Sequence, residues 1–233
     1  MSKIYYSFQD MPFNKWEENP YEPEKILKFS KNEIIQILIA IGVLTIAFSF
    51  ALTPTDGIPL SNTSQALSLI PIAFLAIVTA FFCHELGHKF MGQKYGYWSE
   101  FRMFPMGLLL ALFLGIFTGF VFAAPGAVTI MGHPNKDEYG KISAIGPSIN
   151  ISLAVIFYLL TILTPEVISG IFAFIAFINA FLAFFNLLPF GPLDGMKIFR
   201  WRKEIWLTLG VFSISLVYLT YQNMYLFYSW LYG

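Results

Sequence analysis

The chain has 233 residues, of which 57% are hydrophobic and only 12% are charged, and its formal net charge is zero. Soluble proteins carry about a quarter charged residues, so this composition excludes a soluble globular domain and predicts an integral membrane protein. No basic block suggests nucleic-acid binding, and the single cysteine, Cys83, excludes an internal disulfide framework.

The first 32 residues are polar, contain prolines and lack the apolar core of a secretory signal peptide. Ser30 and Glu33 have the spacing of a helix capping box, which predicts that a helix begins at the water boundary. Residues 34–52 then supply the ~20 apolar residues that a membrane-spanning helix needs. We therefore divide the chain into an N-terminal arm (1–32) and one membrane-embedded domain (33–233).

Apolar segments recur along the rest of the chain. Residues 66–93 indicate a second membrane helix, and the aromatic, alternating stretch 97–105 is typical of a strand or surface segment. The apolar stretch 106–124 is interrupted by glycines, and a turn with a short strand follows at 125–130. Three more spans are predicted, at 143–163, 167–188 and 205–230.

The stretch 106–124 decides how often the chain crosses the membrane. If it crosses, there are six spans, and basic residues fall on both sides. If it dips in and returns, all fourteen Lys and Arg lie on one side, because the loops 53–65 and 164–166 carry none. The positive-inside rule makes that side, with the N-terminal arm, cytoplasmic. We therefore predict an all-α polytopic membrane protein with about five to six transmembrane helices and a re-entrant, β-like segment near 97–130.

The second predicted span contains the sequence His-Glu-Leu-Gly-His at residues 84–88. Residues four apart share one face of a helix, so His84 and His88 can hold one metal ion, with Glu85 beside them. This pattern is typical of zinc hydrolases, in which the glutamate takes a proton from metal-bound water. Ionisable side chains at membrane depth are costly and mark functional sites. The alternative is a structural polar cluster.

A third ligand is needed, because catalytic zinc takes three protein ligands and keeps a fourth position for water. Asp194 is the acidic residue best placed for this role, in a Leu-Asp-Gly after a proline-rich helix end. Taken alone, it fits an ordinary turn. Asp194 and His88 both lie near basic, water-facing ends, so they can meet only if those ends share a side. The re-entrant count allows this meeting, and the six-span count forbids it.

Two asparagines lie in predicted spans. Asn150 follows Gly146 by one turn, so both face the same side of their helix. A buried asparagine can hold a substrate backbone or stabilise an oxyanion, but small and amide side chains equally hold membrane helices together. Asn186, before Pro189, can bond a backbone carbonyl that the proline leaves free.

Taken in order, these motifs resemble those of the site-2 proteases, the intramembrane zinc metalloproteases of regulated intramembrane proteolysis. The resemblance covers about residues 66–203, and it rests on three motifs: His84-Glu85-x-x-His88, Gly146-x-x-x-Asn150 and Asn186-x-x-Pro189-x-x-Pro192-Leu193-Asp194-Gly195. It matches the small archaeal and bacterial type without PDZ or CBS domains. The insertion at 106–124 is longer than a minimal family core needs.

The resemblance implies one zinc ion bound by His84, His88 and Asp194. It also implies that Glu85 is the general acid/base and that Asn150 lies near the substrate; with Asn150 we count a further candidate for substrate positioning, Asn186. The expected localisation is the cell membrane, with the active site toward the cytoplasm.

The predicted function is that of a zinc-dependent metalloendopeptidase acting in or near transmembrane segments of membrane proteins. Its partners are then the lipid bilayer and a substrate's transmembrane segment, which an edge strand from 97–105 or 125–130 would hold extended by β-addition. Two alternatives stay open: a non-proteolytic metal-binding or transport protein, and an inactive homologue that binds membrane proteins. A transporter would place polar residues along a route through most of the bilayer. Here they gather near one face, which favours the protease.

Overall fold

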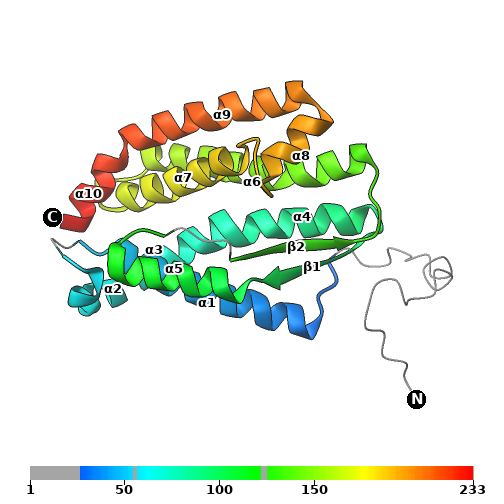
Figure 1. The fold of residues 1–233 in the computed structure, drawn as a ribbon. Coiled ribbons are helices and arrows are strands. Elements are labelled where there is room, and N and C mark those ends of the chain that lie inside the picture. The colour runs from blue at the N-terminus through cyan, green and yellow to red at the C-terminus, as the bar shows by residue number, and fades with distance from the viewer. Residues whose placement is uncertain (1–26, 55–56, 122–124, 233) are drawn as a thin grey trace, which may run out of the picture.

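The computed structural model describes residues 27–54, 57–121 and 125–232 (Figure 1). Most of the predicted N-terminal arm lies outside these ranges. Within them, five helical segments are long and apolar enough to cross a membrane: Lys31–Ala51, Ile70–Lys94, Lys136–Leu163, Ile168–Asn186 and Lys203–Tyr232. The fold class predicted from the sequence is therefore confirmed, and the described residues form an all-α polytopic membrane protein with one small sheet.

Helix α1 (Lys31–Ala51) begins at the predicted capping box. The Ser30 hydroxyl accepts a hydrogen bond from the Glu33 N–H at 3.1 Å, and the Glu33 carboxylate accepts one from the Ser30 N–H at 3.4 Å. These bonds satisfy N–H groups that a helix start otherwise leaves without a partner.

The second span is made of several pieces that follow the short helices η3 (Pro59–Asn62) and α2 (Thr63–Ser68). Helix α3 (Ile70–Ile77) continues through a π-helical turn, η4 (Val78–Phe82), into α4 (Cys83–Lys94). At the junction, the N–H of Cys83 donates to the carbonyl of Val78, five residues back. Such π-turns are rare and frequently occur at functional sites; this one ends two residues before His84.

The chain between the two strands of the sheet leaves one end of the sheet and returns to the same end. Strands β1 (Trp98–Met103) and β2 (Gly126–Met131) pair antiparallel, with Met103 opposite Gly126, so the connection that contains helix α5 (Pro105–Thr118) begins and ends at the same end of the sheet. Fourteen residues span about 21 Å, short of the ~30 Å hydrocarbon core. The chain path therefore agrees with the re-entrant count. Helix α5 lies along α1 (Figure 1).

Helix α6 (Lys136–Leu163) begins earlier than predicted. The predicted span starts at residue 143, but the polar residues 136–141 already form the first turns of this helix. Asn135 and Glu138 form a second capping box, in which the Asn135 side chain accepts from the N–H groups of residues 137 and 138. Local hydrogen bonds thus extend the helix beyond its apolar part.

The C-terminal half consists of α7 (Glu166–Asn186), α8 (Asp194–Trp201), α9 (Lys203–Gln222) and α10 (Met224–Tyr232). The last predicted segment, 205–230, is thus divided near Asn223. Helix α4 lies between two groups of elements, with α1 and the sheet on one side and α6 on the other (Figure 1). Helices α7, α8 and α9 complete the second group.

Candidate metal centre

Three predicted ligands converge at the C-terminal half of the second span. His84 and His88 lie one turn apart on α4, with their Nε2 atoms 3.0 Å apart. The Asp194 Oδ2 atom lies 3.3 Å from the first of these nitrogens and 3.0 Å from the second. All three residues are buried. Neighbouring ligands of a tetrahedral zinc ion, with bonds of 2.0–2.1 Å, are about 3.3 Å apart, so the spacing fits one zinc ion.

The outer nitrogen of each imidazole is held by an acceptor. His84 Nδ1 lies 2.5 Å from Asn150 Oδ1, and His88 Nδ1 lies 2.7 Å from the carbonyl oxygen of Ile142. When both Nδ1 atoms donate, both Nε2 atoms carry lone pairs that point at Asp194 and at each other. Converging lone pairs repel unless a cation lies between them. This donor set therefore suits a metal ion, and the Nδ1 bonds fix the ring orientations that a ligand histidine needs.

Gly146 forms the wall of the site on α6. A Cβ atom at this position would lie 2.6 Å from His84 Nε2 and would overlap His88 Nε2 as well. Only glycine therefore leaves the space in front of the two ligand nitrogens open.

We expect Gly146→Ala to lower zinc affinity at least about 10-fold, the scale on which groups around a metal site act, because the added methyl group displaces the imidazoles. The control is Gly210→Ala, a helical position with nothing within 4 Å of a Cβ. Chelator competition measures both. Equal zinc affinity in the two variants would contradict this geometry.

Asp194 enters the site as the first residue of α8, after Leu193 in an extended conformation. The following Gly195 packs against the carbonyl of Leu187, where a side chain would clash. Burial opposes the charge on Lys197, yet its ion pair with Asp194 at 3.0 Å raises the lysine pKa.

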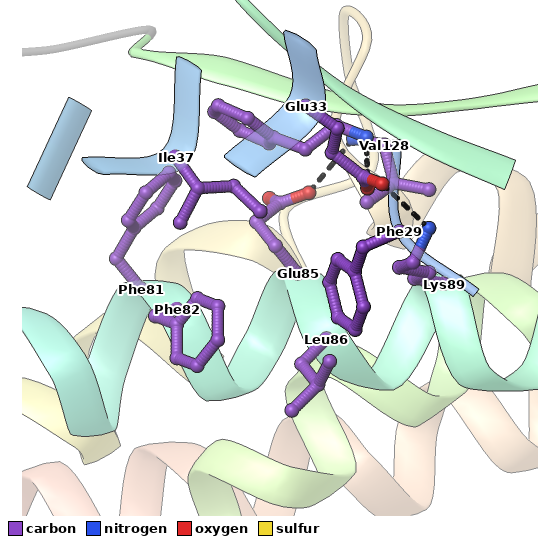
Figure 2. A pocket seen from close by; sticks show the side chains of 10 residues that line it. Phe29, Glu33, Ile37, Phe81, Phe82, Glu85, Leu86, Lys89 and Val128 are labelled. Atoms are coloured by element: carbon purple, nitrogen blue, oxygen red, sulfur yellow. Dashed lines mark hydrogen bonds and ion pairs between the residues drawn. The ribbon is translucent and has the colours of Figure 1, made fainter. Parts of the chain in front are cut away.

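Glu85 lies beside the cluster, as predicted, and faces strand β2. Its Oε2 atom accepts a hydrogen bond from the Val128 N–H at 2.9 Å (Figure 2). A cavity of about 470 Å³ opens here; its lining includes Glu85, both histidines, Asp194, Asn186 and residues 125–130 of β2 and the turn before it. The site therefore combines a candidate metal centre, a carboxylate and room for an extended peptide.

The two predicted substrate-positioning asparagines lie in different places relative to the cavity. Asn186 lines the cavity, and its amide donates to the carbonyl of Leu182 at 3.1 Å. Asn150 is completely buried behind His84 and does not line the cavity. Its contacts support a role in holding the histidine.

Lys89 does not extend its ammonium group to the lipid headgroups, as a lysine near the end of a membrane helix commonly does. Instead it is 1% exposed and forms an ion pair at 2.9 Å with Glu33, which is 0% exposed. It also donates to the carbonyl of Ser99 at 2.6 Å, while the second Glu33 oxygen accepts from the Phe101 N–H. Figure 2 shows this pair beside Glu85, around a small cavity of about 10 Å³. The pair ties α1, α4 and β1 together.

We expect Lys89→Met to destabilise the protein by about 3–5 kcal/mol, because it leaves the Glu33 carboxylate buried without a countercharge. The double variant with Glu33→Gln should recover part of this loss. Unfolding titrations in mixed micelles measure the free energies. Lys141→Met is the control, since it breaks a half-exposed pair with Asp137. A loss of ~1 kcal/mol or less for Lys89→Met, as for an exposed pair, would contradict the description.

The fold and the cluster define a class: a polytopic membrane protein with a buried two-histidine, one-aspartate centre suited to zinc. Comparisons with known proteins agree with a metal centre of this kind. The model of peptidase family M50 matches residues 163–208. The "Putative zinc metalloprotease MJ0611" of Methanocaldococcus jannaschii is 39% identical over 191 residues, covering 80% of this chain and 93% of the relative.

"Zinc metalloprotease MJ0392" of the same organism is 25% identical over 174 residues, covering 72% of this chain and 45% of the relative. No solved structure gives a significant match. The chain belongs to peptidase family M50, the site-2 protease family of zinc metalloproteases.

Proposed function

We propose that this metalloprotease hydrolyses peptide bonds in or near transmembrane segments of other membrane proteins. The observation that carries the proposal is the position of the cluster. His84, His88 and Asp194 are buried at a membrane-spanning helix, and they open onto a cavity lined by a strand. A substrate that reaches this cavity must present an extended segment at membrane depth.

In the proposed mechanism, His84, His88 and Asp194 hold the zinc ion. When bound, zinc supplies an activated water with a pKa of about 7 and polarises the scissile carbonyl. Glu85 takes the proton from the attacking water and delivers it to the leaving amine. Its hydrogen bond from the Val128 N–H keeps the carboxylate at the edge of the cavity, where it can reach the attacking water and the leaving amine.

The two strands differ in how open their edges are. The N–H groups of Phe101 and Met103 on the outer edge of β1 donate to side chains of α1, Glu33 and Gln36. Residues of an antiparallel ladder alternate between hydrogen-bonded and non-hydrogen-bonded pairs. Phe101 and Met103 are in non-hydrogen-bonded pairs with Val128 and Gly126. The backbone N–H and C=O groups of Gly126, Val128 and Ile130 therefore point away from β1, along the cavity. This asymmetry favours β2 over β1 as the strand that receives an unwound substrate by β-addition.

We expect Ile130→Pro to lower cleavage about 10-fold while zinc affinity stays unchanged. Proline removes an N–H that faces the substrate side and leaves the β1–β2 ladder intact, and one lost hydrogen bond of ~1.4 kcal/mol corresponds to this factor. Ile130→Ala, which keeps the N–H, is the control. Equal cleavage by Ile130→Pro and Ile130→Ala would rule out pairing at this position.

We further propose that the active site faces the cytoplasm, together with the N-terminal arm. The support is the sequence distribution of Lys and Arg, which the re-entrant path places on one side. Lys89 no longer counts as a free charge in this argument, because Glu33 neutralises it. An impermeant thiol reagent tests the orientation in a Cys83→Ser background. It should label Lys203→Cys only from the cytoplasm and Ser61→Cys only from outside; the reverse pattern would overturn the orientation.

Proteolysis itself is tested with purified protein in proteoliposomes that contain a model transmembrane substrate. Cleavage should stop when a chelator removes the metal and return when zinc is added. Metal binding without cleavage of any transmembrane substrate would favour the metal-handling or inactive-homologue alternatives. The buried histidines and Asp194 form one compact cluster, with ligand atoms within 4.8 Å of one another, which supports a single catalytic centre over a transport route.

A further inference from the structure

A chain of buried hydrogen bonds connects helix α7 to the metal centre. Asn179 donates from Nδ2 to the carbonyl of Ile175 at 2.9 Å and to the hydroxyl of Thr79 at 3.2 Å. Its Oδ1 atom accepts a hydrogen bond from Asn150 Nδ2 at 3.1 Å. Asn150 Oδ1 in turn lies 2.5 Å from His84 Nδ1. Both asparagines are 0% exposed.

The direction of this chain follows from its fixed ends. Backbone carbonyls can only accept, so the Asn179 amide must turn its NH₂ group toward Ile175. The Asn150 NH₂ group must likewise face the carbonyl of Ala80, 2.8 Å away. The Asn150 oxygen is then left for His84, whose Nδ1 donates. The bare Nε2 of His84 therefore points at the metal position.

The two ligand histidines are held by different kinds of acceptor. His88 is held by the carbonyl of Ile142, which belongs to the helix backbone and cannot exchange donor for acceptor. His84 is held by a side-chain amide, which can rotate and present a donor instead. The Asn150 amide thus needs groups that lock it. These are Asn179 and Ala80, the latter within the π-helical turn η4, which also supplies Thr79.

We propose that Asn179 is a positioning residue of the metal centre: it locks the Asn150 amide and thereby holds His84 in the tautomer and orientation that metal binding requires. Asn179 touches neither the cavity nor any ligand atom, and it acts through Asn150. This proposal rests on the proposed role of His84 as a zinc ligand. The proposal also explains the π-helical turn, because Thr79 and Ala80 of that turn accept the hydrogen bonds that fix the amides of Asn179 and Asn150.

Zinc affinity tests the proposal directly. Asn179→Leu removes the amide at similar volume, and we expect its zinc dissociation constant, measured by chelator competition, to rise about 10-fold, at the lower end of the effects of groups around a metal site. Asn150→Leu should raise it by at least as much. The control is Thr220→Val, which likewise removes a fully buried polar group, here a hydroxyl bonded to its own helix, but lies on α9. Its zinc affinity should equal that of wild type.

A second measurement separates positioning from a general loss of stability. The chain has only three histidines, so ¹⁵N-histidine labelling gives few ring signals, and His84→Asn assigns one set. In zinc-free wild type the His84 ring should carry its proton on Nδ1. In Asn179→Leu a population protonated on Nε2 should appear, whereas Thr220→Val should keep the wild-type signals even if its melting temperature falls.

Unchanged zinc affinity with an unchanged His84 tautomer in Asn179→Leu would overturn the proposal. If that variant does not fold, Asn179→Ala serves instead, since alanine suits a helix interior, and the same two outcomes decide. His84→Asn distinguishes this failure from failure of the proposed site. If His84→Asn binds zinc like wild type, the ligand assignment itself is wrong.

Discussion

Glu85→Gln should lower the rate of peptide-bond cleavage by about 10²–10⁴-fold, the contribution of a positioned general acid/base, while zinc content stays at the wild-type level. Glutamine has the same shape and keeps an oxygen for the hydrogen bond from the Val128 N–H. It cannot accept the proton of the attacking water. The predicted effect is therefore on the chemical step alone.

Single-turnover cleavage and metal analysis of the purified variants measure this effect. Glu204→Gln, an exposed glutamate at the start of α9, is the matched control and should cleave like wild type. If Glu85→Gln lost its zinc, Glu85 would act as a ligand or a structural group. If it cleaved at the wild-type rate, the assignment of Glu85 as general acid/base would be wrong.

Asp194→Asn should raise the zinc dissociation constant by more than about 100-fold, since even groups around a metal site contribute 10–100-fold, and cleavage should fall with the bound metal. The carboxylate is the only anionic member of the cluster. An amide would bring a weaker ligand and remove the charge that offsets the metal.

Chelator competition again provides the measurement. The control is Asp137→Asn, which changes a half-exposed aspartate paired with Lys141 on α6. Retention of tight zinc binding by Asp194→Asn would show that the third ligand lies elsewhere.

The metal cluster could be predicted because each of its members follows from a short rule. Helical periodicity places His84 and His88 on one face, and the coordination number of zinc then calls for a third ligand. The distribution of Lys and Arg selected Asp194 by placing it on the same side of the membrane. The chain path through β1, α5 and β2 agrees with that argument.

Other features could not be predicted because they depend on contacts between distant elements. Glu33 fits a helix cap and Lys89 a surface lysine, and only the packing of α1 against β1 and the second span brings them together in the interior. No residue pattern in the sequence indicates the π-helical turn before Cys83.

Two further features could have been predicted from the sequence. Asn179 did carry a signal, because a polar residue inside an apolar span needs a partner. The early start of α6 was also readable, since its capping box follows the same rule that located α1.

Mass spectrometry of the products from a model transmembrane substrate, cleaved by the reconstituted wild-type protein, tests whether the buried metal centre cuts polypeptides inside the membrane. We predict new termini within the apolar segment of the substrate that are absent when Glu85→Gln replaces wild type. New termini confined to the water-exposed flanks, or the same termini with Glu85→Gln, would rule out cleavage inside the membrane by this centre.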